Sequence, residues 1–210
     1  MGKKDIAAKK WLSDKGRFSD MCNAVLFGGE QVVSAEDLER ADSESDIIIT
    51  DKNGKSRGVQ RYRDIVMRWK QGAEFIVLAC ENQDKVHYAM PVRNMIYDGL
   101  TYAEQIGRMW KGQAGEKRQM TEEEFLSRMN KDDKLIPVIT MVFYYGEKKW
   151  DGSRSLHGMF RKSEDKALLK VMEKYIPDYS INLIDASDPE KLCAFHTDLQ
   201  LILGMLQSCL

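Results

Sequence analysis

The sequence lacks the residue patterns that define several classes of protein. Its four cysteines are scattered without a Cys-x-x-Cys pair, and its three histidines show no metal-ligand spacing. We therefore expect free buried thiols rather than a disulfide framework, and neither a zinc site nor a histidine-centred catalytic triad. No apolar run reaches the roughly 18 residues of a membrane-spanning helix, and the lysine-rich start is not followed by the apolar stretch of a secretory signal. These absences favour a protein of the reducing cytoplasm.

The chain also lacks a strong net charge, which is −1 at pH 7. Its 43% apolar and 31% charged residues are typical of a globular protein, and 210 residues are enough for one domain with a core. The charges are unevenly placed. Residues 52–70 hold seven basic residues and one acid, whereas residues 36–46 hold six acids and one arginine. A basic block of this kind can be a solvated face, and it can also attract the phosphates of a nucleic acid.

Residues 61–83 have the pattern of a β-hairpin. Two segments rich in β-branched and aromatic residues flank a Lys-Gln-Gly-Ala turn. Side chains alternate between the faces of a strand, so the second segment places three apolar residues, an acid and an amide on one face: Phe75, Val77, Ala79, Glu81 and Gln83. Packing alone does not explain an acid and an amide at the end of an apolar face.

The first segment of the hairpin can be aligned with the second if the turn centres on Gln71 and Gly72. Asp64 then lies opposite Ala79, on the same face as Glu81 and diagonally next to it. Diagonal neighbours in a sheet lie roughly 7–8 Å apart, close enough for two carboxylates to share a cation. A shift of one residue in this register would move Asp64 to the other face.

Two carboxylates that lie so close repel each other unless a cation joins them. Mg²⁺ fits such a site, because it prefers carboxylates, water and phosphate oxygens as ligands. Beside a phosphodiester the ion acidifies a water and stabilises the leaving oxygen. The alternative is structural: Asp64 pairs with a nearby arginine, and Glu81 ends a solvated strand. Spacing alone leaves both interpretations open.

Longer blocks of the sequence carry a family resemblance. Asp64, followed after sixteen residues by Glu81-Asn82-Gln83, is similar to the Asp…Glu-x-Lys signature of the PD-(D/E)XK nuclease superfamily. In their order along the chain, three blocks resemble the recombination-promoting nuclease family, whose members are often labelled transposases: RYRDIVMRW, ENQDKVHYAMPVRNMIYDGLTYAEQI and LIPVITMVFYYGEKKWDGSRSLHGM. The resemblance covers roughly residues 17–160.

The resemblance implies an α/β fold with a PD-(D/E)XK nuclease-like αβββαβ core, in which helices flank a mixed central sheet. It divides the chain into a polar N-terminal arm at residues 1–16, the nuclease-like core at 17–160 and a helical extension at 161–210. The extension ends while it is still apolar, as a truncated chain would. An exposed apolar end of this kind favours a homodimer.

The resemblance also implies metal-dependent hydrolysis of DNA. Mg²⁺ or Mn²⁺ would be held by the carboxylates of Asp64 and Glu81 and by the backbone carbonyl of Asn82. Gln83 stands where most members of the superfamily have lysine; its amide can orient a water or contact a phosphate, but it carries no charge. The first core helix of the superfamily sometimes supplies a further acid, which makes Asp20 a candidate metal ligand.

Four residues are candidates for substrate binding. Arg61 and Arg63 lie in the basic block of the hairpin, and Arg93 follows the Glu-Asn-Gln segment within reach of a phosphate. Polar positions of the next helix lie near the active site in the family, which makes Gln105 a candidate as well. The expected partners are DNA and a divalent metal, and the expected location is the cytoplasm, at the nucleoid when DNA is bound.

Two other functions remain open. A catalytically idle relative could bind DNA or a protein partner through the same scaffold. A different phosphodiesterase or an RNA-directed nuclease could also be built on this fold.

The remaining patterns predict the secondary structure. We expect helices at 18–27, ended by two glycines, and at about 34–40, then strands at 47–50, 59–69 and 75–83 in an antiparallel meander. A long helix with Pro91 in its first turn should pack on the sheet through an apolar stripe: Val92, Met95, Ile96, Leu100, Ala103, Ile106 and Trp110. Further on, the patterns predict a capping box and a short helix from residue 121, and then a buried strand at 135–145 that runs parallel to 75–83. The last elements expected are a helix at 163–175, a strand at 179–184 and a final helix from 187.

Overall fold

The computed structural model describes residues 10–41, 44–50, 56–62, 65–79, 86–113, 121–146, 148–186, 194–198 and 201. For residues 44–50, 56–62 and 73–79 it describes the backbone but not the side chains. Within these ranges no helix combines the length and the apolar character that a membrane crossing requires.

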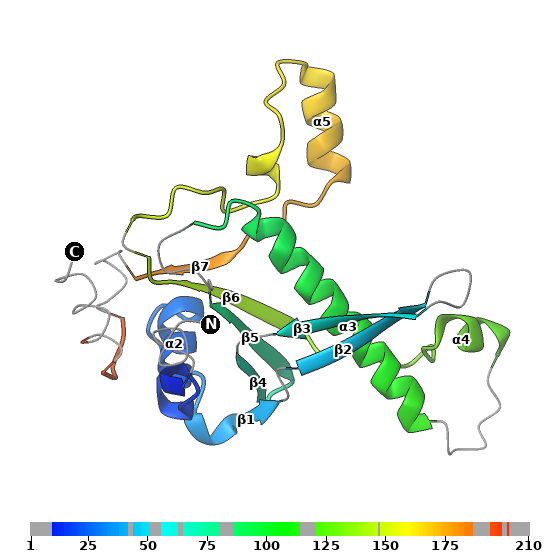
Figure 1. Cartoon of the computed structure of the whole chain (residues 1–210), viewed down its shortest axis with the longest axis horizontal. Helices are drawn as coiled ribbons and strands as arrows, with labels where there is room; N and C mark the ends of the chain where they lie inside the picture. Colours follow the sequence, from blue (N-terminus) through cyan, green and yellow to red (C-terminus); the bar gives the residue numbers. More distant parts are fainter. Residues whose placement is uncertain are drawn as a thin grey trace.

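A five-stranded mixed sheet forms the centre of the protein (Figure 1). Its strands lie in the order β1 (Leu38–Ala41), β4 (Ile65–Trp69), β5 (Ala73–Ala79), β6 (Val138–Tyr144) and β7 (Asn182–Asp185). β4 is antiparallel to β1 and β5, whereas β6 runs parallel to β5 and β7. The expected α/β class and the parallel pairing of the two apolar strands are confirmed.

Helices cover both faces of this sheet, α2 (Lys15–Leu26) on one side and α3 (Met90–Gln113) on the other (Figure 1). Alternate side chains of β6 point to opposite faces, so one strand contributes to both layers. Met141 belongs to the apolar cluster that includes α2, and Val142 packs in a second cluster with Met90 at the start of α3. The connection from β5 through α3 to β6 therefore leaves β6 buried on both sides, as the apolar run predicts.

The β4–β5 hairpin has a register one residue away from the predicted one. Trp69 pairs with Ala73 and Ile65 with Val77, which leaves a three-residue loop instead of a two-residue turn. The amide of Gly72 donates to the carbonyl of Trp69 at 3.0 Å, and Gly72 has φ +92°. A turn that ends in a left-handed glycine is a common three-residue hairpin loop, because glycine adopts this conformation without strain. The predicted alignment around a two-residue turn is therefore wrong.

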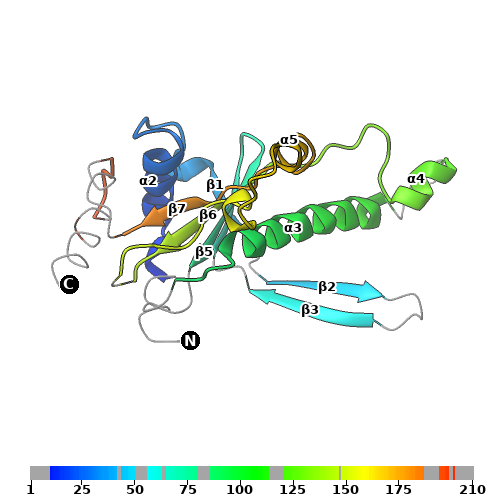
Figure 2. The same cartoon turned by 90° about the horizontal axis from the view of Figure 1, so that it is seen from above.

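β2 (Glu44–Thr50) and β3 (Ser56–Tyr62) form a separate two-stranded antiparallel sheet. Figure 2 shows this hairpin beside α3 and apart from the central sheet, and β2 contacts α3. The predicted hairpin after residues 47–50 is confirmed. The predictions of one strand over 59–69 and of a three-stranded meander are wrong, because β3 and β4 belong to different sheets.

The edge of the central sheet is formed by β1, where the sequence predicts a helix. Ser34 caps a helical turn as expected, and its hydroxyl accepts from the amide of Glu36 at 3.4 Å. That turn, however, is only the short 3-10 helix η1 (Ala35–Asp37). Leu38 then pairs with Trp69 of β4 and is fully buried. Burial of this side chain in the core outweighs the weak local preference for helix.

The long helix α3 packs on the sheet through a polar face, which contradicts the predicted apolar stripe. Asn94, Thr101 and Gln105 are 1%, 2% and 7% exposed. Met95 and Ile96, members of the predicted stripe, are 39% and 47% exposed. The first residues of β6 and the segment before it present backbone groups and a threonine hydroxyl to this helix, and buried polar groups require partners. The polar side chains of α3 supply those partners.

Local end signals are confirmed elsewhere. Gly28 and Gly29 follow α2 with φ of +62° and +95°. Thr121 and Glu124 form the predicted capping box. The remaining helices are α4 (Glu122–Ser127), α5 (Lys166–Tyr175) and the short 3-10 helix η2 (His157–Met159).

Candidate functional site

Most of the predicted nuclease residues lie outside the described residues: Arg63, Asp64, Glu81, Asn82 and Gln83. Arg61 belongs to β3, of which only the backbone is described. Their predicted roles in metal binding, catalysis and DNA binding stay predictions.

The described part of the hairpin shows where these residues join the fold. β4 begins at Ile65, immediately after residues 63–64, and β5 ends at Ala79, immediately before residues 80–85. Because Ile65 pairs with Val77, the start of β4 and the end of β5 lie at the same end of the hairpin. The topology therefore joins the two predicted segments to one end of one hairpin.

The observed register changes the argument for a carboxylate pair. The prediction that Asp64 and Glu81 share a face used a pairing of Asp64 with Ala79, which belongs to the alignment that is wrong by one residue. The pairing of the two carboxylates consequently rests on the family resemblance rather than on strand geometry.

Asp20 is buried in α2, at 3% exposure, and it holds a distant segment of the chain. Its carboxylate accepts from the backbone amides of His196 (2.9 and 3.0 Å) and Thr197 (2.7 Å) and from the Thr197 hydroxyl (2.6 Å). Residues 194–198 are not helical, so the predicted final helix is wrong over this segment. Asp20 has an anchoring role in the structure, and its predicted role as a metal ligand is a separate prediction.

The two described candidates for substrate binding also have partners within the fold. The guanidinium of Arg93 lies 5.5 Å from the centre of the Tyr97 ring. Gln105 donates to the carbonyl of Ile136 at 3.0 Å and accepts from the amide of the same residue at 2.8 Å. These contacts fix the two side chains on α3, and their predicted roles toward DNA stay predictions.

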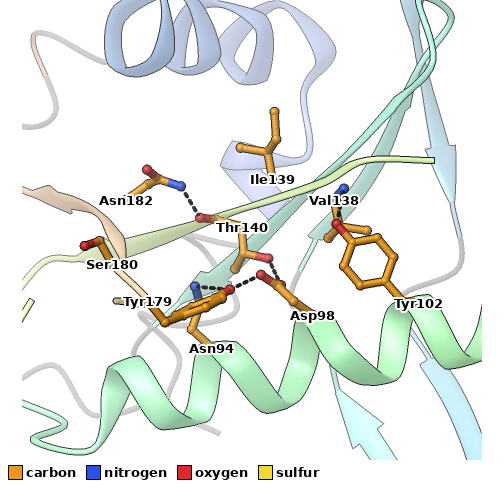
Figure 3. A pocket seen from close by; sticks show the side chains of 9 residues that line it. All are labelled: Asn94, Asp98, Tyr102, Val138, Ile139, Thr140, Tyr179, Ser180 and Asn182. Atoms are coloured by element: carbon orange, nitrogen blue, oxygen red, sulfur yellow. Dashed lines mark hydrogen bonds between the residues drawn. The ribbon is translucent and has the colours of Figure 1, made fainter. Parts of the chain in front are cut away.

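A polar cluster that the sequence analysis did not identify lies between α3, β6 and the segment before β7 (Figure 3). The hydroxyl of Thr140 donates to one carboxylate oxygen of Asp98 at 2.5 Å, and the hydroxyl of Tyr179 donates to the other. The side-chain amide of Asn94 donates to the oxygen of Tyr179 at 3.4 Å. These residues border a cavity of about 280 Å³, which is also lined by Tyr102, Val138, Ile139, Ser180 and Asn182.

Burial dominates the electrostatics of this cluster. It raises the pKa of the Asp98 carboxyl, although the hydrogen bonds from Thr140 and Tyr179 act in the opposite direction. Burial and the neighbouring Asp98 carboxylate raise the pKa of the Tyr179 hydroxyl. Among the described residues that line the cavity there is no lysine, arginine or histidine. Asp98 is thus a half-buried acid whose lining partners are all uncharged.

A sequence signal for this cluster does exist. Asn94, Asp98, Thr101 and Gln105 recur at intervals of three and four residues, which places them on one face of a helix. The apolar stripe beside them has the same period, and periodicity alone cannot decide which of two adjacent stripes faces the sheet.

Within the described ranges no group of three or more histidine, cysteine, aspartate and glutamate side chains could hold a metal ion. The predicted ligands Asp64 and Glu81 lie outside those ranges. A metal site at the end of the β4–β5 hairpin is therefore a prediction about residues beyond the described part of the chain.

Sheet and helices together define a protein of the mixed α/β class. Residues 118–209 match the family model described as Putative transposase, YhgA-like, a family of the PD-(D/E)XK superfamily. The match spans α4, β6, α5 and β7 and confirms the family resemblance of the sequence; the hairpin that joins Asp64 and Glu81 lies outside it. No curated protein and no solved structure matches the chain.

Proposed function

We propose that the protein is a metal-dependent DNA endonuclease associated with transposition or recombination. The observation that carries the proposal is the match of residues 118–209 to the transposase family. The motif Asp64…Glu81-Asn82-Gln83 adds the residue types that phosphodiester hydrolysis requires, and the β4–β5 hairpin joins both parts of the motif at one end.

The order of elements supports this proposal. Along the chain, α2, β1, β4, β5, α3 and β6 follow the αβββαβ order that the resemblance implies, with the β2–β3 hairpin inserted after β1. Ligands of open α/β sheets commonly bind beyond the carboxyl ends of the strands. β5 ends at Ala79 beside the parallel strand β6, and Glu81 follows two residues later in the sequence.

The chemistry of the donor set fits a hard divalent ion. The carboxylates of Asp64 and Glu81 and the carbonyl of Asn82 would hold Mg²⁺ or Mn²⁺, which prefer oxygen ligands. Such an ion supplies acidification of a water and stabilisation of the leaving oxygen. Gln83 would orient the attacking water or contact the phosphate, and Arg61, Arg63 and Arg93 would bind the phosphate backbone.

Cleavage of supercoiled plasmid in Mg²⁺, Mn²⁺ or EDTA tests the proposal. We expect nicked or linear product with either metal and none with EDTA. Asp64→Ala should abolish the product, whereas Asp132→Ala, which removes an exposed acid elsewhere, should leave it unchanged. Mn²⁺ binding by calorimetry provides a readout that is independent of activity. Unaltered cleavage by folded Asp64→Ala protein would rule out the assigned site.

Gln83 supports a second candidate function. The superfamily's usual lysine would stabilise negative charge in the transition state, and glutamine cannot do so. A catalytically idle protein that binds DNA or a protein partner through the same scaffold would retain DNA binding without metal-dependent product. Gel-shift and cleavage assays on the same sample distinguish this alternative from the nuclease.

A further inference from the structure

The cavity between α3, β6 and the segment before β7 has the features of a binding site (Figure 3). We propose that it binds an organic monocation, an ammonium or a guanidinium group, whose N–H donors contact Asp98 and Asn94. The cavity is lined by none of the predicted nuclease residues. It lies at the first residues of β6, which pair with the beginning of β5, whereas Glu81 follows the end of β5. The proposal does not depend on nuclease activity.

The first argument is charge. Asp98 is partly buried, and both of its carboxylate oxygens are held by uncharged hydroxyls. A carboxylate in such surroundings is stabilised by a cation more strongly than one in open water, because the local dielectric constant is lower. Two carboxylate oxygens have about four lone-pair sites, so acceptor capacity remains after the hydrogen bonds from Thr140 and Tyr179.

The second argument is an acceptor without a donor. Asn94 is 1% exposed, and its side-chain oxygen has no hydrogen-bond partner among the described residues. Its amide nitrogen is engaged with Tyr179, so the oxygen is the atom left for an occupant. A buried acceptor without a donor costs stability, and an occupant of the cavity with an N–H group would remove that cost. An N–H group in the cavity would supply that donor to Asn94 and a positive charge to Asp98.

The lining favours an organic cation over a metal ion. A divalent metal needs several oxygen ligands, and Asp98 is the only carboxylate among the described residues of the lining. Two tyrosines and two aliphatic side chains form much of the remaining wall: Tyr102, Tyr179, Val138 and Ile139. Aromatic rings attract ammonium and guanidinium groups through cation–π interactions, and the aliphatic wall accommodates a carbon stem.

The required chemistry is carried by free amines and guanidines and also by lysine and arginine side chains of a protein partner. Two sets of probes distinguish these sources: propylamine and methylguanidine as free cations, and capped single residues, N-acetyl-lysine methylamide and N-acetyl-arginine methylamide, as models of a peptide. Binding is followed by two-dimensional ¹H–¹⁵N NMR of the whole chain. We expect shifts that saturate in the micromolar to millimolar range and concentrate around residues 94–102 and 138–140.

Two variants and one control make the test decisive. Asp98→Asn should weaken binding at least about tenfold, because a hydrogen bond to a charged group is lost. Asn182→Lys changes an exposed residue of the lining and brings a tethered ammonium to the cavity, so it should compete with every probe. Asp132→Asn removes one exposed carboxylate elsewhere and should bind like the parent protein.

The outcomes separate clearly. Saturable shifts that need a higher probe concentration in both cavity variants and are unchanged in the control support the site. Stronger binding of the capped residues identifies a side chain as the occupant, and stronger binding of the free cations identifies a small molecule. Absence of saturable shifts with all four probes overturns the proposal, and so does equal binding by the parent and the folded Asn182→Lys protein.

Discussion

Gln105 and Ile136 exchange two hydrogen bonds, so that a helix side chain pairs with the backbone just before a strand. The side-chain Nε2 of Gln105 donates to the backbone carbonyl of Ile136 at 3.0 Å. The side-chain Oε1 of Gln105 accepts from the backbone N–H of Ile136 at 2.8 Å. Two residues further on, the amide of Val138 donates to the hydroxyl of Tyr102 at 3.1 Å. The polar face of α3 thereby holds the beginning of β6 in the central sheet.

The first prediction concerns this contact. Gln105→Leu keeps a similar volume but leaves the partly buried N–H and C=O of Ile136 without their side-chain partner, and we expect a loss of about 2 kcal/mol in the free energy of unfolding. Chemical denaturation measures it. Gln71→Leu makes the same replacement at an exposed turn position, where the change should stay within about 0.5 kcal/mol. Equal stabilities of the two variants would contradict the anchoring role.

The second prediction contrasts two glycines. Gly29 has φ +95°, and its amide donates to the carbonyl of Asn23 at 2.9 Å, so Gly29→Ala should cost about 1–2 kcal/mol through backbone strain. Gly99 lies exposed within α3, and a side chain there would meet nothing within 4 Å. Gly99→Ala should therefore stabilise the protein by about 0.5–1 kcal/mol. Thermal unfolding of both variants checks the opposite signs.

The third prediction is a pH dependence that arises from Asp98. Burial raises the pKa of its carboxyl in the folded state, so the folded protein binds this proton more tightly than the unfolded chain does. The resulting stabilisation is present below the ordinary pKa of about 4 and is lost as the pH rises through the raised pKa. The melting temperature of the parent relative to Asp98→Asn should therefore fall over this interval. A difference that is independent of pH would show that Asp98 does not titrate in this way.

The fourth prediction separates the two roles of Asp20. Asp20→Asn replaces an acceptor of several hydrogen bonds from residues 196–197 by a neutral amide, and we expect a loss of about 2 kcal/mol and faster proteolysis near these residues. Mn²⁺ affinity, measured on the same protein, tests the metal role. A variant that keeps its stability but loses Mn²⁺ affinity would make Asp20 a ligand rather than an anchor.

The fifth prediction concerns Gln83. If its amide positions a water or a phosphate while the metal carries the charge, Gln83→Lys should retain DNA binding and part of the cleavage rate, and Gln83→Ala should lose more of it. Cleavage rates against Mg²⁺ concentration for both variants provide the measurement. An alanine variant that equals the parent at every Mg²⁺ concentration would remove Gln83 from the catalytic machinery.

Local chemistry made several elements predictable from the sequence. The glycine pair after α2 permits left-handed backbone, Thr121 and Glu124 satisfy the first amides of α4, and the apolar run around Met141 requires burial on both faces. Each signal depends on residues that are neighbours along the chain. The family resemblance could also be recognised from the sequence, and residues 118–209 match the model of the transposase family.

The predicted nuclease site was readable only as a motif. Asp64 and Glu81 are identified by their spacing and by the resemblance, but their common face depended on a register that the sequence did not define. Two-residue and three-residue loops are both compatible with Lys-Gln-Gly, and they differ by one residue in the pairing of β4 with β5.

The sequence by itself determined the apolar strand β6, the helix ends and the resemblance to the transposase family that residues 118–209 match. The tertiary structure alone decided that Leu38 enters a strand, that β3 and β4 belong to different sheets, and that α3 turns Asn94 and Gln105 rather than Ile96 toward β6. The physical reason is common to these cases. Burial and hydrogen-bond satisfaction depend on groups that are distant along the chain, such as Trp69 for Leu38 and Ile136 for Gln105, and their demands exceed the few tenths of a kcal/mol by which local preferences differ.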